Sequence, residues 1–143
     1  MQAAEYLEHV KLNPGELLFK EGDKSFFFYI IQQGNVEIYL HDGTGKKITL
    51  AVAEPGQAVG EFAMITKRPR SASAVALTPV ELVKISEEGY QQLLKELPEW
   101  AFSMIQTLVD RLSQADQTIR KHSLENAQLK KTLEAILSGS SKN

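Results

Sequence analysis

The segment 56–76 has the residue types and spacing of an anion-binding site. Gly60 precedes a short run of helix-forming residues, and the first backbone N–H groups of a helix have no partners within the helix, so they can bind an anion. Arg70 follows a proline, and its guanidinium can donate two parallel hydrogen bonds to one phosphate. This combination predicts a cradle for a phosphate group, with further contacts from Ser71 and the N–H group of Ala72.

A carboxylate lies next to this predicted cradle. Glu61 would begin the short helix, and a carboxylate beside an anion is unfavourable unless it accepts hydrogen bonds from donors of its own. The 2′-hydroxyl of a ribose is such a donor, and it stands beside the phosphate in a cyclic nucleotide. We therefore expect Glu61 to bind the sugar while the arginine and the helix N–H groups bind the phosphate. The small side chains of Ala72, Ser73 and Ala74 would let a purine lie close to the chain.

The chain is long enough for one compact domain with a hydrophobic core, since it has 143 residues, 43% of them hydrophobic and 24% charged. The net charge of -2 and the pI near 5.9 argue against direct binding of nucleic acid, which usually takes a strongly basic surface. No apolar run approaches the roughly 20 residues of a membrane span, and the N-terminus lacks a signal-peptide pattern. The absence of cysteine excludes disulfides, thiolate metal ligands and thiol nucleophiles. We expect a cytoplasmic protein with no membrane partner.

The first part of the chain has the pattern of an antiparallel β-fold. Short runs rich in β-branched and aromatic residues are separated by turn signals such as Pro-Gly and Asp-Gly. The predicted strands are residues 26–32, 36–40, 48–52, 73–77 and 81–85. Val36, Ile38 and Leu40 alternate with polar or amphipathic residues, which places them on the face inside a barrel. We therefore predict an α+β fold, an antiparallel β-roll resembling a jelly-roll barrel, with a short helix over residues 3–9 at one end.

Helical sequence follows the strands. A short helix is predicted for residues 87–94, and Pro98 is well placed to open a second helix. No proline or glycine interrupts the chain from there to Leu137. The predicted organisation is a β-roll domain with flanking helices at residues 1–97, a long C-terminal helix at 98–137, and a linker or disordered tail at 138–143.

These residues together resemble the cyclic nucleotide-binding domain family, which includes catabolite activator proteins and the regulatory subunits of protein kinase A. The matching motif is Gly60-Glu61, four apolar residues, three variable residues, and then Pro69-Arg70-Ser71-Ala72. The resemblance covers roughly residues 10–122 and implies a cyclic nucleoside monophosphate as the ligand. It further implies that Glu61 binds the ribose 2′-hydroxyl, that Arg70 binds the cyclic phosphate, and that Gly60, Phe62 and Ala63 shape the binding segment.

The identity of the base is the open question within this resemblance. In the family, base contacts come from the residue after the arginine and from the long helix. Ser71 is compatible with guanine or adenine, Asp116 is placed to accept the exocyclic amine of adenine, and Arg111 or Arg120 would cover the purine face. With Ser73, these helix residues are the candidates for base contact, and cyclic AMP is favoured over cyclic GMP. The alternative is a coiled-coil interaction module of the same fold that has lost ligand binding or binds another nucleotide, such as a cyclic dinucleotide.

The long helix has a regular apolar seam that is independent of the family resemblance. Residues at the alternating spacing of three and four are Ile105, Leu108, Leu112, Ala115, Ile119, His122, Asn126, Leu129, Leu133 and Ile136. In a parallel pair of helices, Arg111 would meet Asp116 of the other helix and Glu125 would meet Lys130, both with opposite charge. A buried Asn126 would favour two strands in register. The pattern predicts a homodimer through this helix.

Alternatives remain at four of these helix positions. Ile105 and Leu108 can pack on the β-roll of their own chain instead of on a second copy. His122 is a tolerated polar residue in the seam or a weakly pH-sensitive one. Asp116 has two competing roles, base recognition and pairing between helices.

No combination of residues predicts catalysis. His9, His41 and His122 belong to separate predicted elements, so they do not form a histidine cluster for a metal. No nucleophile, triad or second positioned carboxylate accompanies Glu61. We expect no enzyme activity, no metal and no cofactor, and a regulatory role in which ligand occupancy acts through the dimeric helix on an output domain or partner protein.

Overall fold

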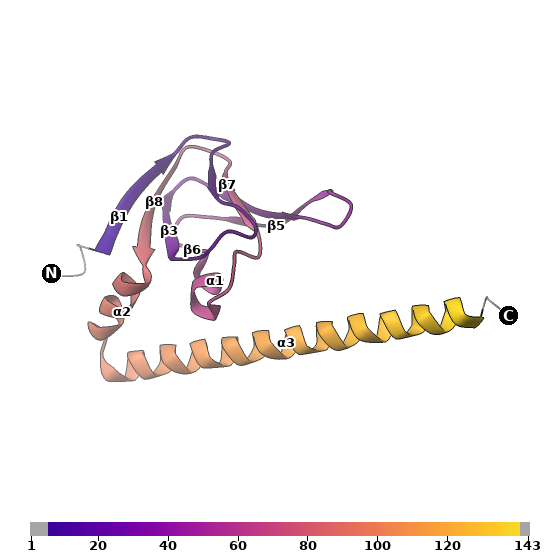
Figure 1. The fold of residues 1–143 in the computed structure, drawn as a ribbon. Helices are drawn as coiled ribbons and strands as arrows, with labels where there is room; N and C mark the ends of the chain where they lie inside the picture. The colour runs from indigo at the N-terminus through magenta and orange to yellow at the C-terminus, as the bar shows by residue number, and fades with distance from the viewer. Residues whose placement is uncertain (1–5, 141–143) are drawn as a thin grey trace. The chain divides into compact units, whose positions relative to one another are not determined.

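Two antiparallel sheets of four strands form the body of the computed structural model, which describes residues 6–140 (Figure 1). The first sheet has the order β1-β8-β3-β6 and the second the order β2-β7-β4-β5. The strands are β1 Leu7–Leu12, β2 Leu17–Phe19, β3 Phe27–Gln33, β4 Val36–His41, β5 Lys47–Ala53, β6 Ala58–Val59, β7 Ser73–Ala76 and β8 Val80–Ser86. The predicted α+β class with an antiparallel β-roll is confirmed.

The main core lies between the two sheets. Val36 and Leu82 are fully buried there, and Ile38 packs against the same cluster, as the alternation along the predicted strand 36–40 indicated. Burying a side chain of this size stabilises a fold by about 1.5–3 kcal/mol relative to leaving it exposed. Because both sheets contribute to one core, the facing surfaces of β4 and β8 are held at a fixed separation.

Two helices cover the outer face of the first sheet. Helix α1 is Glu61–Thr66 and helix α2 is Glu87–Lys95. Met64 of α1 packs with Phe28, Val83 and Ile85 in a second apolar cluster. Tyr90 of α2 meets the ring of Phe28 edge-on, with centroids 5.9 Å apart. This cluster fixes α1, and with it the predicted binding segment, against β3.

Helix α3 is Glu99–Ser140 and continues without interruption through the C-terminal part of the chain. The carbonyl of Pro98 accepts hydrogen bonds from the N–H groups of Ala101 and Phe102, so the predicted helix start at this proline is confirmed. The chain divides into two compact units, residues 1–102 and 103–143. Residues 138–140 are helical where we predicted a linker or tail, and residues 141–143 lie outside the described part. Between Tyr6 and Ser140, none of the helices combines the length and apolar character that crossing a membrane requires.

The predicted helix at residues 3–9 is wrong where the structure describes it. Leu7 and His9 belong to strand β1, which pairs along its length with β8; residues 3–5 lie outside the described residues. The hydrogen-bonding edge of β8 overrides the weak helical pattern of a segment that is too short to be stable alone. Strands β2 and β6 were also not predicted, because they are short and owe their extended form to the strands beside them.

Candidate functional site

A cavity of about 540 Å³ lies where strand β6, helix α1 and the loop before β7 meet strands of the second sheet. All seven residues predicted to bind the ligand line it: Gly60, Glu61, Phe62, Ala63, Arg70, Ser71 and Ala72. The remaining wall comes from residues that were not predicted to bind the ligand: Phe19, Ile38, Ala51, Val52, Ala53, Gln57, Ala58 and Val59. The fold therefore joins one polar segment of the chain to an apolar wall from four strands.

Arg70 is the most deeply buried charged residue of this cavity, with 4% of its surface exposed. Its Nη1 donates to the carbonyl oxygen of Gly60 at 2.7 Å, and its Nη2 donates to the carbonyl oxygen of Phe27 at 2.6 Å. The guanidinium lies 4.2 Å from the ring centroid of Phe19, a cation–π contact. These contacts hold the guanidinium in one position in the loop that precedes β7.

The positive charge of Arg70 is incompletely compensated by the protein. Among residues 6–140 no carboxylate forms an ion pair with it, and its buried Nε has no hydrogen-bond acceptor. Burial lowers the pKa of Arg70, while Tyr29, Asp23 and Glu61 act in the opposite direction through their charges. An arginine stays protonated in proteins, so the cost of desolvation stands unless an anion approaches. The site is thus suited to an anionic group.

Gly60 makes the position of Arg70 possible. It precedes α1 with φ at 80°, a left-handed backbone conformation that residues other than glycine rarely adopt. A Cβ atom at this position would lie 2.4 Å from Nη1 of Arg70 and 3.1 Å from Cε2 of Phe19. Within residues 6–140 no side chain caps the beginning of α1, so its first N–H groups have no side-chain acceptor at the cap. Both features leave the start of α1 open to a ligand atom.

Glu61 lines the same cavity from the first turn of α1 and is half-buried. It forms no ion pair with Arg70. Ser71 is exposed and Ala72 is buried, so a hydroxyl and a small side chain follow the guanidinium along the chain. The cavity therefore contains a cation for a phosphate and a separate carboxylate that can accept a hydrogen bond from a hydroxyl.

The residues that the sequence missed supply the apolar wall. Ile38 comes from β4 and Ala51–Ala53 from β5, whereas Gln57, Ala58 and Val59 precede α1 in the chain. The run 48–52 was predicted as a strand, but the side of it that faces a cavity depends on its register with β4. The only local signal was the run of small apolar residues at 51–53.

Ser73 lies outside the set of residues that line the cavity, and its proposed contact with a base stays a prediction. It is buried, and its hydroxyl accepts a hydrogen bond from the N–H group of Glu21 at 2.9 Å. This bond fixes the start of β7 to the loop after β2. Arg111, Asp116 and Arg120 lie on α3 in the second compact unit, and their part in base recognition stays a prediction.

The three histidines lie in different elements, His9 in β1, His41 at the end of β4 and His122 in α3. No group of three or more His, Cys, Asp or Glu side chains within residues 6–140 is arranged to hold a metal ion.

Comparison with known proteins gives a family and several relatives. The family model described as "Cyclic nucleotide-binding domain" matches residues 9–97. The Cyclic AMP receptor protein of Thermus thermophilus is 32% identical over 125 residues, which are 87% of this chain and 58% of that protein. A cAMP-dependent protein kinase regulatory subunit of Colletotrichum orbiculare is 36% identical over 91 residues, which are 64% of this chain and 22% of that protein. The chain thus spans little more than half of the first relative and less than a quarter of the second.

The solved structures give the same result for the fold. An EAL enzyme in a halfsite-occupied form superposes with a TM-score of 0.71 at 28% identity, and the match covers 76% of this chain and 97% of that chain.

Proposed function

The chain belongs to the cyclic nucleotide-binding domain family, and on this premise we propose that it is a sensor module for cyclic AMP. In this proposal Arg70, the first N–H groups of α1, Ser71 and the N–H group of Ala72 bind the cyclic phosphate. Glu61 accepts the hydrogen bond of the ribose 2′-hydroxyl. Phe62 and Ala63 shape the segment.

The observation that carries the proposal is the buried guanidinium of Arg70, which forms no ion pair with Glu61 of the same cavity or with any other carboxylate of residues 6–140. A cyclic phosphate carries one negative charge and would neutralise this cation in a region of low dielectric, where charge-assisted hydrogen bonds are strong. Glu61 beside it forms no ion pair with the side chains that the structure describes, which favours a ligand that offers a hydroxyl as well as a phosphate. The apolar wall of β4 and β5 suits the face of a purine.

The preference for cyclic AMP rests on the two relatives, whose names refer to cyclic AMP. We extend the proposal to signalling through a dimer of α3. Its seam exposes large apolar side chains: Leu108, Leu112, Ile119, Leu129, Leu133 and Ile136. Ligand binding would shift the population of conformations around α1 and α2, and α3 would transmit the shift to an output domain or a partner protein.

Calorimetric titration of the full chain with cyclic AMP, cyclic GMP and cyclic di-GMP tests the proposal. We expect saturable binding of one cyclic AMP per chain, weaker binding of cyclic GMP, and no binding of the dinucleotide. The ligand class is confirmed independently if mass spectrometry finds a cyclic nucleotide retained from expression. Saturable binding of none of the three would reduce the chain to an interaction module. Preferential binding of cyclic GMP would overturn only the proposed base preference.

A further inference from the structure

Strand β5 contains an irregularity that decides which of its residues face the cavity. The pairing with β4 runs from Lys47 to Thr49, skips Leu50, and resumes at Ala51, which lies opposite Ile38. An extra residue in one strand reverses the face on which every later side chain lies. Without this bulge, Ala51 would share a face with Thr49 instead of with Ile38, and the cavity wall would change.

The bulge also explains why the apolar pattern of β5 is misleading. Residues facing each other across two strands lie on the same side of the sheet. Ile48 and Ala51 therefore lie on the inner side, opposite Leu40 and Ile38, although three positions separate them. A regular strand would place them on opposite sides. The inner face of β5 next to the cavity is made by Ala51 and Ala53 because of the skipped residue.

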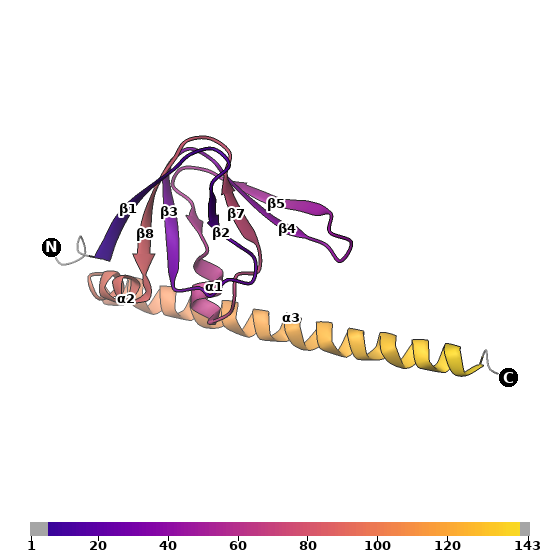
Figure 2. The ribbon, with the colours of Figure 1, turned by 45° about the horizontal axis from the view of Figure 1, so that its top comes forward.

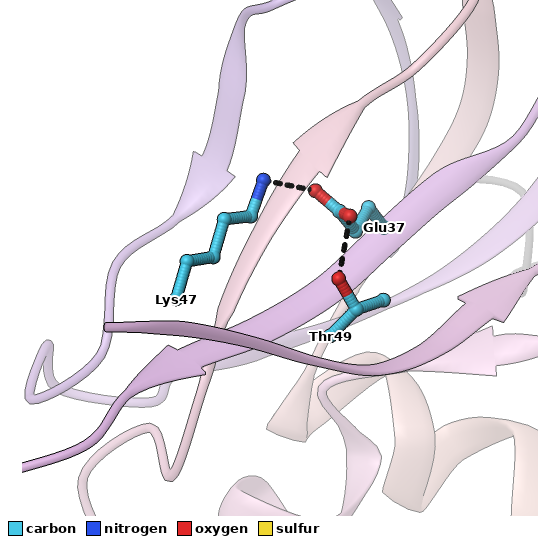
Figure 3. Close-up of polar contacts among 3 residues, drawn as sticks. All are labelled: Glu37, Lys47 and Thr49. Carbon is cyan, nitrogen blue, oxygen red and sulfur yellow. Dashed lines mark hydrogen bonds and ion pairs between the residues drawn. The ribbon is translucent and has the colours of Figure 1, made fainter.

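A polar network on the outer side of the sheet spans this bulge. Glu37 of β4 lies opposite Val52, on the cavity side of the bulge, whereas Lys47 and Thr49 lie on its far side. Oε1 of Glu37 pairs with Nζ of Lys47 at 2.5 Å, and Oε2 accepts the hydroxyl hydrogen bond of Thr49 at 2.9 Å (Figure 3). One carboxylate thus ties both ends of the irregular stretch together.

The carboxylate of this network makes more contacts than one in an ordinary surface ion pair. The side chain of Glu37 is only 14% exposed, and Nζ of Lys47 also lies 4.5 Å from the ring centroid of Tyr39. The two bonds from Lys47 and Thr49 hold the pKa of Glu37 below its ordinary value. Fully exposed ion pairs contribute little to a fold, but a carboxylate with two fixed donors restricts the strand that carries those donors.

We propose that Glu37 is a positioning residue for the nucleotide cavity, because its carboxylate clamps the β5 bulge and so presents Ala51 and Ala53 to the ligand. The inference rests on the proposed function for the identity of the ligand. It adds that the base wall of this site is set from the opposite side of the sheet, by a residue that does not itself line the cavity.

Three variants of the full chain test this role. Glu37→Val removes both contacts and keeps a residue that favours strands, Glu37→Gln keeps an acceptor for Thr49, and Thr49→Val removes only the bond from Thr49. The matched control is Glu81→Val. Glu81 pairs with Lys11 at 3.4 Å across β8 and β1, in the sheet that lacks the β5 wall.

The measurements are cyclic AMP affinity by calorimetry and amide hydrogen exchange at residues 51–53, both well below the unfolding temperature. We expect Glu37→Val to weaken cyclic AMP binding about fivefold, which corresponds to the upper end of the free energy that one cross-strand side-chain pair contributes. Amide hydrogen exchange at residues 51–53 should become faster. Glu37→Gln and Thr49→Val should each produce a smaller loss, and Glu81→Val should leave affinity and this exchange unchanged.

The outcomes separate this role from general stabilisation and from the ligand assignment. Unchanged affinity in Glu37→Val, with wild-type protein binding cyclic AMP, overturns the positioning role. An equal loss in Glu81→Val overturns it too, since both variants would then act through stability alone. If Glu37→Val does not fold, the decision rests on Glu37→Gln and Thr49→Val. Failure of the wild-type protein to bind any cyclic nucleotide instead overturns the proposed function, and exchange at residues 51–53 then decides whether Glu37 still orders β5.

Discussion

The cavity around Arg70 and the distal part of α3 place side chains in opposite kinds of unfavourable surroundings. In the cavity, a cation is buried with 4% of its surface exposed and no carboxylate partner among the described residues. In the seam of α3, Leu129 is 61% exposed and Leu133 is 58% exposed. The first region has charge without water, and the second has apolar surface in water.

From this difference we infer which kind of contact would stabilise each region. Desolvating an unpaired charge costs several kcal/mol, and an anion that supplies hydrogen-bond acceptors offsets this cost. Exposed leucines in a regular seam gain about 1.5–3 kcal/mol each when another apolar surface covers them. The proposed ligand of the cavity must therefore match its charge and geometry, whereas the proposed partner of the α3 seam must be a helix with a matching apolar face.

The largest expected effect is at the cavity. Arg70→Ala should weaken cyclic AMP binding by about 2–5 kcal/mol, the usual cost of deleting one partner of a buried charge pair. Calorimetry measures the affinity, and circular dichroism establishes that the variant is folded. The cyclic AMP affinity of Arg70→Lys should lie between those of the wild-type protein and Arg70→Ala, because lysine keeps the charge but cannot donate two parallel hydrogen bonds. An unchanged affinity in Arg70→Ala would remove the phosphate assignment.

The second prediction concerns the seam of α3. Leu129→Glu should weaken the dimer about a hundredfold, because one substitution removes a buried leucine from both helices. The matched control is Leu124→Glu, since Leu124 lies on the outer side of the predicted pair of helices and is exposed. Sedimentation velocity over a range of concentrations gives the dimer fraction. Equal dimerisation of wild-type protein and Leu129→Glu would show that another surface joins the chains.

The third prediction concerns Gly60 in the cavity, where a larger residue would introduce both backbone strain and a steric conflict with Arg70. Gly60→Ala should reduce cyclic AMP affinity about tenfold, because the new Cβ would displace the guanidinium of Arg70 and the left-handed backbone would be strained. Gly15→Ala is the control, since Gly15 also has a positive φ, 87°, but a Cβ there meets nothing within 4 Å. Both variants should lose stability, measured by thermal unfolding. A similar affinity loss in the two variants would contradict the steric explanation.

The smallest expected effect is a pH dependence of stability that belongs to the β4–β5 hairpin, seen in Figure 2. The pKa of Glu37 is lowered by its bonds with Lys47 and Thr49, and the pKa of Asp42 is lowered by Thr44, first through its hydroxyl, and by the N–H group of Lys46. A lowered folded pKa stabilises the fold above the ordinary carboxyl pKa, and this contribution is lost as the pH falls through the folded value.

Urea denaturation at neutral pH and at about pH 3 measures this loss. In the double variant Glu37→Gln, Asp42→Asn the free energy of unfolding should fall less steeply with acid than in the wild-type protein. The same slope in both proteins would assign the acid sensitivity to other carboxylates.

The sequence predicted the strands that carry a strong local signal. The five predicted runs correspond to β3, β4, β5, β7 and β8, because β-branched and aromatic residues between turns favour extended chain. Strands β1, β2 and β6 depend on pairing with β8, β7 and β3. Their extended form comes from distant partners, which local residue patterns do not specify.

The candidate site likewise consists of residues that were predicted from the local sequence and residues that only the tertiary structure places there. Gly60, Glu61 and Arg70 were predicted because they lie close together in the chain and have complementary chemistry. The apolar wall was missed, since its faces depend on the bulge at Leu50. Ser73 was predicted to contact the base because it is small and near the arginine, and the tertiary structure adds a hydrogen bond that its hydroxyl accepts from the N–H group of Glu21.

The amino-acid sequence by itself determined the class of fold, the segment for which we predict anion binding and the apolar seam of α3, since each depends on side chains at short or periodic spacing. Only the tertiary structure decided that Arg70 is buried against Gly60 and Phe27, and that Ala51 faces the cavity. The physical reason is the distance along the chain over which each kind of interaction acts. Propensity and periodicity act over a few residues, whereas burial and strand register result from contacts between segments far apart in the chain.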